Sequence, residues 1–312
     1  MKTLKFVVSL PNNNSYQKEQ AAAAANAARQ LGAEVQVLYA ENDSIMQSQQ
    51  LLEIIQSHKE SKPDAILFEP LTSTALQRVG EAAVNAGIGW VVLNCDVEYL
   101  GALRKNSNSN VPAFAITRDH TEIGRLQGRQ FAALLPQGGN VLYIQGPATS
   151  SAANQRTTGV ESTRPSNIQI KALRSQWSEE SANQAVSSWL RLSTSTANSI
   201  DLVGCQYDGI AMGALKALQN HTDFGERQKW AHIPFTGVDG LREEGQAWVD
   251  RGMLAATILT PTTTQLGMQM VVDALKKGVQ PPERTLMELK SYPSLDQLAT
   301  KGKQLAAQKG KK

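Results

Sequence analysis

Amide, hydroxyl and carboxylate side chains gather at four places where an apolar run of the sequence turns polar. They follow residues 6–8, 90–93, 202–205 and 233–236. Such groups suit a neutral polyhydroxylated ligand, because each hydroxyl both donates and accepts, and a planar amide, carboxylate or guanidinium can pair with two hydroxyls at once. Polar groups left unpaired in a closed site are costly, so the same chemistry supplies specificity. The pattern indicates reversible binding of a small polar molecule.

Residues 202–218 carry the clearest of these transitions. The segment is typical of a short buried strand at 202–205 that turns at once into a helix rich in small residues with one apolar face. Open α/β sheets bind ligands at the carboxyl ends of their strands, so Tyr207 and Asp208 lie where a ligand would be. Asp208 could instead act only as a helix cap.

The sequence carries no pattern typical of catalysis or phosphate binding. Residues 9–14, which follow the first apolar run, contain no glycine, so neither the dinucleotide fingerprint nor the P-loop applies there. No Gly-x-Ser-x-Gly nucleophile elbow occurs, and the four histidines lie in different segments. We therefore expect no enzymatic activity, no metal and no cofactor.

Composition limits the partners. The chain has 312 residues, which allows two domains, and a formal net charge of +3. This near balance does not support nucleic-acid binding, which needs a basic face or stripe. No apolar run approaches the length of a membrane span, so we expect no insertion into a bilayer. Lysines gather near the C-terminus, and we interpret residues 301–312 as a solvated tail.

The N-terminal residues leave the compartment open. Residues 1–3 lead straight into a strand-like run at 4–10 and not into a long apolar signal core. Either an export signal was removed and a start methionine added, or the protein is cytoplasmic.

Strand and helix signals alternate along the chain, which predicts an α/β fold of parallel sheets covered by helices. Loop composition marks residues 103–110. Asn14, with Gln17 three residues on, resembles a capping box at a helix start, and Gly32 is a helix stop. We predict strands near 4–10, 34–39, 65–69, 90–94, 113–116, 140–145, 168–174, 201–205, 233–238 and 255–259. We predict helices near 15–31, 44–58, 73–86, 119–135, 151–163, 179–192, 209–220, 241–250 and 262–277.

Three segments together carry a family resemblance. They are Gln-Tyr-Asp with Ala-Met-Gly-Ala at 206–214, Gly-Val-Asp-Gly at 237–240, and Ala-Ala-Thr-Ile at 255–258. With these the chain resembles a periplasmic sugar-binding protein of the ribose-binding type over roughly residues 4–290. That family shares its type I fold with the effector domains of Lac-repressor-like regulators.

The resemblance implies two similar doubly wound parallel-sheet lobes joined by a three-segment hinge. The N-terminal lobe would be 1–117 plus 261–287, and the C-terminal lobe 118–260 plus 288–312. The implied function is capture of a sugar or polyol in the interlobe cleft by hinge closure, by a periplasmic monomer that delivers it to the permease of an ABC transporter. The alternatives are a regulator's effector domain without its DNA-binding head, and an enzyme, since fold does not imply function.

In the first lobe the resemblance implies ligand contacts after two strands. Ser9 and Asn12 or Asn13 match polar positions after the first strand, and Tyr16 matches one of two adjacent aromatic positions there. A second group stands where ribose binders carry an Asp-Arg pair, a departure that argues against ribose itself. It consists of Asn94 and Cys95, with Asp96 able to compensate in part.

In the second lobe the matching positions combine amide, cationic, aromatic, carboxylate and hydroxyl groups. Asn154 stands at an arginine ligand of the family and Arg156 at the second arginine of that motif. The others are Trp177, Tyr207, Asp239 and Thr260. Cys95 and Cys205 fall one in each half, and because a bond across a closing cleft would lock it, we expect free thiols.

Overall fold

The chain divides into two compact units. The computed structural model describes residues 3–72, 74, 76–106, 111–192, 199–220, 225, 228 and 230–309. The first unit comprises Met1–Arg118 and Pro261–Met287, and the second comprises Asp119–Thr260 and Glu288–Lys312. The chain thus passes from one unit to the other three times, and the first passage falls one residue after the predicted 117.

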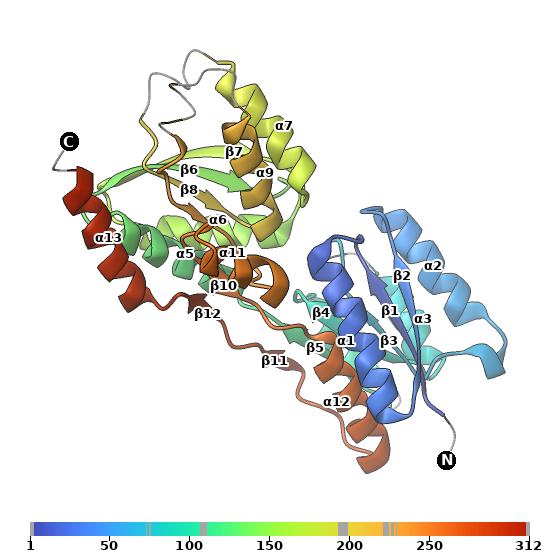
Figure 1. The fold of residues 1–312 in the computed structure, drawn as a ribbon. Helices are drawn as coiled ribbons and strands as arrows, with labels where there is room; N and C mark the ends of the chain where they lie inside the picture. The colour runs from blue at the N-terminus through green and yellow to red at the C-terminus, as the bar shows by residue number, and fades with distance from the viewer. Residues whose placement is uncertain are drawn as a thin grey trace. The chain divides into compact units, whose positions relative to one another are not determined.

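The first unit is a doubly wound α/β domain (Figure 1). Its sheet has the order β11-β5-β4-β3-β1-β2, and all of its strand pairs are parallel. The elements in chain order are β1 (Lys5–Leu10), α1 (Ser15–Leu31), β2 (Glu34–Tyr39), α2 (Ser44–Gln56), η1 (Lys59–Ser61), β3 (Ala65–Phe68), α3 (Gln77–Asn85), β4 (Gly89–Asn94), α4 (Leu100–Asn106), β5 (Ala113–Thr117), α12 (Thr264–Lys277) and β11 (Arg284–Leu286).

Successive residues of these strands pack against opposite faces, because side chains alternate along a β-strand. Val7 and Ile66 belong to a core formed with α2, α3 and α4. Val8 and Leu67 belong to a second core formed with α1 and α12, which pack against each other (Figure 1). Burial on both faces explains why the strands read as continuous apolar runs.

The second unit repeats this architecture around a four-stranded sheet of order β7-β6-β8-β9 with parallel pairs. Cores on one face join α5, α6 and α13 to the strands, and α7 and α9 pack together on the other face (Figure 1). The elements in chain order are α5 (His120–Leu134), β6 (Gly139–Gln145), α6 (Ser151–Thr163), β7 (Ile168–Arg174), α7 (Glu179–Leu190), β8 (Leu202–Cys205), α9 (Asp208–Gln219), β9 (Phe235–Thr236), the π-helix η2 (Arg242–Gln246), α11 (Ala247–Asp250), β10 (Thr257–Leu259), β12 (Lys290–Tyr292) and α13 (Leu295–Lys309). The predicted α/β class is confirmed, and within the described residues no helix is both long and apolar enough to cross a bilayer.

Four predictions of local structure need correction. Residues 100–106, partly predicted as loop, form α4, and 107–110 lie outside the described residues. The predicted C-terminal tail is helical to Lys309, because Leu298 is fully buried against α5 and the sheet. The strand predicted at 233–238 shortens to two residues, and the helix predicted at 241–250 begins as a π-helix.

The start of α1 follows the predicted cap in part. Asn14 Oδ1 accepts a hydrogen bond from the Gln17 amide at 3.0 Å, and Gly32 ends the helix with φ +64°. In a capping box the Gln17 side chain would also accept from the Asn14 amide. Here that amide donates to Asn12 Oδ1 instead, at 3.0 Å. The Gln17 side chain therefore remains available for a different contact.

Helices α5 and α6 approach so closely that their contact requires glycine. A Cβ at Gly124 would overlap the carbonyl oxygen of Arg156 on the facing helix. The substitution Gly124→Ala should therefore lower the free energy of unfolding by roughly 1–3 kcal/mol, the usual cost of overpacking. Urea denaturation measures this difference.

Gly101→Ala is the matched control, because Gly101 is also helical but its added Cβ would find no atom closer than 3.6 Å. It should be neutral or stabilise by up to about 1 kcal/mol, since alanine favours helix more than glycine does. Equal effects of the two substitutions would contradict the packing argument.

Candidate ligand-binding site

Each of the two parallel sheets has one point where the strand order reverses. It lies between β1 and β3 in the first unit and between β6 and β8 in the second. At such a switch point the neighbouring chain segments leave the sheet toward opposite faces, so a crevice opens at the carboxyl ends of the strands. The polar residues at these two edges are therefore the candidates for ligand binding.

In the first unit a buried hydrogen-bond network centres on Asn94, the last residue of β4. Asn94 Oδ1 accepts from Tyr16 OH at 3.1 Å and from Thr263 Oγ1 at 3.3 Å, and Gln20 Nε2 lies 3.4 Å away. The Asn94 backbone is left-handed, with φ +64°, which asparagine tolerates better than most residues. Since its carbonyl is engaged within the unit, Asn94 orders the strand end and its neighbours.

Glu69 is the first-unit residue that the sequence analysis missed. Its Oε2 accepts from Gln17 Nε2 at 3.0 Å and from Asn94 Nδ2. It is only partly buried, and it directly follows β3, one of the two strands at the switch point. The predicted strand at 65–69 ran one residue too far and so included Glu69. The sequence feature that could have identified Glu69 is the change from the apolar Phe68 to a carboxylate at the strand end.

Gln17 adds an acceptor beside this carboxylate. The residue is 4% exposed, and its Oε1 is buried without a hydrogen-bond partner. A buried unpaired acceptor is uncommon in a folded protein. Glu69 and Gln17 together therefore suit a ligand that donates hydrogen bonds.

Tyr16 does not present a bare aromatic surface. The Cζ of Arg118 lies 4.4 Å from the centre of its ring. Gln20 Nε2 donates to the Tyr16 hydroxyl at 2.7 Å, and Arg118 Nη2 donates to the carbonyl of Pro261 at 3.0 Å. The cation over the ring makes this position more polar than the predicted stacking wall.

The remaining first-unit predictions are not brought together by the structure. Ser9 has no exposed surface, and its Oγ accepts from Gln47 Nε2 at 3.2 Å, on the side of α2. Asn12 Nδ2 donates to Asn42 Oδ1 at 2.8 Å, while Asn13 is exposed. These contacts support the loop after β1 and leave Asn13 as its outward-facing amide.

Asp96, predicted to compensate in part for the Asn-Cys departure, lies at the surface. It is exposed, and its Oδ2 accepts from Arg284 Nε of β11 at 2.8 Å. Its Oδ1 accepts from the backbone of Val97. Asp96 thus takes part in a surface ion pair, while Cys95 lies at the strand end, half-buried.

In the second unit Arg156 of α6 has unused hydrogen-bonding capacity. It is 5% exposed, its Nη1 donates to the carbonyl of Gln206, and its Nε is buried without a partner. Its Cζ lies 5.5 Å from the centre of the Trp177 ring, and Trp177 is half-buried. A guanidinium beside an aromatic ring suits a ligand with both hydroxyls and an apolar C–H face.

Asp239 and Thr260 form the second part of this edge. Thr260 Oγ1 donates to Asp239 Oδ1 at 3.1 Å, and the Thr260 amide donates to the Asp239 carbonyl at the same distance. Tyr207, which follows β8 and precedes α9, is also buried. Asn154 is exposed and donates to the Ala148 carbonyl at 3.0 Å, so it braces a loop outside this group.

Comparison with known proteins decides the family. The family model described as the periplasmic binding protein domain matches residues 5–278. The chain belongs to the periplasmic binding protein family. The resemblance seen in the sequence is thereby confirmed, and this periplasmic binding protein binds solutes and is not an enzyme.

Individual relatives agree with this assignment. The D-allose-binding periplasmic protein of Escherichia coli K12 is 27% identical over 277 residues, which cover 86% of this chain and 83% of the relative. A xylitol-binding protein of Mycolicibacterium smegmatis is 27% identical over 69% of this chain and 57% of its own length. The solved structure of an ABC transporter solute-binding protein from Actinobacillus succinogenes with bound D-allose has a TM-score of 0.78, at 20% identity, covering 96% of this chain and 100% of that one. These matches confirm the predicted fold.

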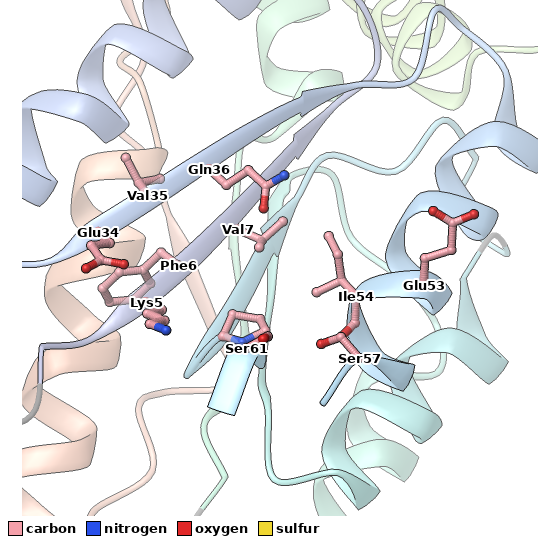
Figure 2. A pocket seen from close by; sticks show the side chains of 11 residues that line it. Lys5, Phe6, Val7, Glu34, Val35, Gln36, Glu53, Ile54, Ser57 and Ser61 are labelled. Carbon is pink, nitrogen blue, oxygen red and sulfur yellow. The ribbon is translucent and has the colours of Figure 1, made fainter. Parts of the chain in front are cut away.

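A cavity of about 500 Å³ in the first unit lies elsewhere (Figure 2). Its lining includes Lys5 and Glu34, the first residues of β1 and β2, together with Glu53 and Ser57 of the α2 region. It therefore opens at the amino ends of the strands, away from the polar residues described above. We do not assign it to the ligand of this periplasmic binding protein.

Other titratable groups provide no reactive centre. Burial raises the pKa of the Cys205 thiol well above its usual range, which disfavours the nucleophilic thiolate. Neither cysteine takes part in a disulfide. Among the described residues, no group of His, Cys, Asp and Glu is arranged to hold a metal ion.

The carboxyl group of Asp208 gives a pH dependence that can be measured. Burial raises its pKa well above the usual range, and the neighbouring Asp239 raises it further. Its stabilising contribution is therefore fully present below the unfolded-state pKa of about 4 and is lost as the pH rises through the folded-state pKa. Asp208→Asn cannot ionise, so the stability of the wild type relative to this variant should fall as the pH rises above about 4.

Urea denaturation of both proteins at a series of pH values tests this expectation. The wild type should lose free energy of unfolding relative to Asp208→Asn across that range. A difference that stays constant with pH would contradict the raised pKa of Asp208.

Proposed function

We propose that this periplasmic binding protein captures a sugar or polyol between its two units and delivers it to the permease of an ABC transporter. The observation that carries the proposal is the pair of polar groups at the switch points, one group in each unit. Both combine a carboxylate with an arginine next to an aromatic ring, and the first group adds amides.

The two groups differ in the hydrogen bonds that they offer, and this favours a polyhydroxylated ligand. In the first unit, the Glu69 carboxylate is a hydrogen-bond acceptor, and the buried Oε1 of Gln17 is an acceptor without a partner. In the second, the buried Nε of Arg156 is an unpaired donor and Asp239 is an acceptor. Hydroxyls can serve both kinds of group because each both donates and accepts.

Relatives support this ligand class. They include proteins named for binding D-allose and xylitol, and a structural relative with bound D-allose. These names also favour a transport role over the effector domain of a regulator. We infer from them a periplasmic location and the permease partner.

Ligand capture would proceed by closure of the two units. The chain connects them through three segments, after residues 118, 260 and 287. A ligand that contacts residues of both units binds the closed state more strongly than the open one, so it shifts the population toward closure.

A thermal-shift screen tests the ligand class. D-allose and xylitol come first, followed by other aldohexoses, inositols, nucleosides and amino acids. A ligand at one hundred times its dissociation constant adds about 2.7 kcal/mol to the stability of the folded state, so the melting temperature should rise clearly for at least one sugar or polyol. A shift only with nucleosides or amino acids would overturn the proposal.

Asp239→Ala tests the site itself. Hydrogen bonds to charged groups each contribute roughly 1.5–3 kcal/mol, so the variant should bind its sugar or polyol about 10- to 100-fold more weakly by calorimetry. Asp96→Ala is the matched control, because Asp96 is exposed and paired with Arg284, and it should bind like the wild type. Loss of affinity in the control but not in Asp239→Ala would place the site at the first-unit position that the structure assigns to an ion pair.

A further inference from the structure

We propose that Asp208 is the positioning residue of the second unit, which holds Asp239 in its ligand-binding conformation by bonding the residues on both sides of it. The inference rests on the proposed function, because it explains how the carboxylate of Asp239 is presented. Asp208 itself is not a ligand contact in this scheme, since it is only 1% exposed.

Asp208 forms hydrogen bonds with the residues directly before and after Asp239. The Asp208 amide donates to the carbonyl of Val238 at 2.8 Å. Its Oδ2 accepts from the amide of Gly240 at 2.7 Å. Since Val238 and Gly240 are the immediate neighbours of Asp239, these two bonds fix the peptide groups that determine where its side chain points.

Asp239 requires such support because its backbone is strained. Its φ is +109°, a value that residues with a side chain rarely adopt. Conformations of this kind cost on the order of 1–3 kcal/mol and persist only where the surroundings determine them. The Asp239 amide donates to the Ile258 carbonyl at 3.0 Å, which adds a third restraint on the same turn.

The same carboxylate also reaches β10. Thr257, fully buried, donates its hydroxyl to Asp208 Oδ1 at 2.7 Å. Thr257 begins β10, and Thr260, whose hydroxyl donates to the Asp239 carboxylate, directly follows the end of this strand. One side chain thus connects the start of α9, the turn after β9 and the strand that leads to Thr260.

Two glycines make room for this carboxylate. A Cβ at Gly237 would overlap Asp208 Oδ1, and a Cβ at Gly245 would overlap Oδ2. Gly245 belongs to the π-helix η2, so the irregular start of this helical segment accommodates the Asp208 side chain.

The alternative role as a helix cap does not describe these contacts. The N-cap of α9 is Tyr207, which makes no side-chain cap bond. The Asp208 oxygens accept from Gly240 and Thr257 and not from the first amides of α9. The carboxylate therefore serves the turn that carries Asp239.

A comparison of Asp208→Ala with Asp208→Asn tests the inference, with D-allose as probe, or xylitol if it gives the larger shift in the screen. Asp208→Ala should weaken binding roughly tenfold, as expected for loss of a buried hydrogen bond that fixes the turn. Asp208→Asn should stay within about threefold of the wild type, because its carbonyl can accept from Gly240 and its amide can donate to Thr257 Oγ1.

Two further measurements separate positioning from a general structural role. In the Asp239→Ala background, Asp208→Ala should cause no additional loss of affinity, because coupled residues are not additive. Asp201→Ala is the matched control, since Asp201 Oδ2 also accepts from a backbone amide, that of Asn140, at 2.9 Å. It should lower the melting temperature and leave affinity unchanged, because Asn140 lies at the amino end of β6.

Hydrogen exchange of the ligand-free protein makes the test independent of the proposed function. The Gly240 amide should exchange faster in Asp208→Ala than in the wild type. If the wild type binds no sugar or polyol but this exchange is faster, the proposed function fails and the restraint on the turn stands. Wild-type affinity together with unchanged Gly240 exchange in Asp208→Ala would overturn the inference.

Asp208→Ser covers the case in which Asp208→Ala does not fold, because it keeps a polar side chain that is too short to bond Gly240. The same loss of affinity and faster exchange are expected. Failure of both variants to fold where Asp201→Ala folds would overturn a positioning role in favour of a purely structural one.

Discussion

Parallel strand pairing is the constraint on which the rest of this molecule depends. Because neighbouring strands run the same way, all of their carboxyl ends reach one edge of each sheet. Helices must then return the chain across the faces, and where the strand order reverses these helices leave toward opposite sides. The polar residues at that point come from segments that leave the sheet in different directions, which is why side chains as different as Glu69 and Arg156 occur there.

The polar residues at these edges fall into two groups. In one group the side-chain oxygens accept hydrogen bonds from within their own unit, and in the other a buried side-chain atom has no hydrogen-bond partner. Asn94 and Asp208 have their oxygens engaged by partners in their own unit. Gln17 and Arg156 each keep a buried atom without a partner. Buried unpaired atoms are uncommon in folded proteins, so these two atoms are the first to examine for contacts to a ligand. Residues with engaged oxygens and residues with an unpaired atom thus occur at the same edges.

Much of the fold could be predicted because its signals are local. The apolar runs gave the strands, and Asn14 and Gly32 marked the ends of α1. Glu69 was missed because strand periodicity does not define the last residue of a strand. The hydrogen-bond partners of Asp96 and Ser9 could not be predicted because they are distant in sequence, Arg284 and Gln47. The helix α4 was missed because its C-terminal half falls in a segment of loop composition, and α13 because the lysines near the C-terminus were interpreted as a solvated tail.

The placement of α12 and α13 also sets an order of events during synthesis. Met268 and Val271 of α12 complete the core that contains Phe6, and Leu298 of α13 completes the core that contains Phe131. A ribosome releases the chain from its N-terminus, so the segments made first wait for partners made last. The cores that contain Phe6 and Phe131 can therefore close only after α12 and α13 have been made, whereas the core that contains Val7 needs no residue beyond Ala115.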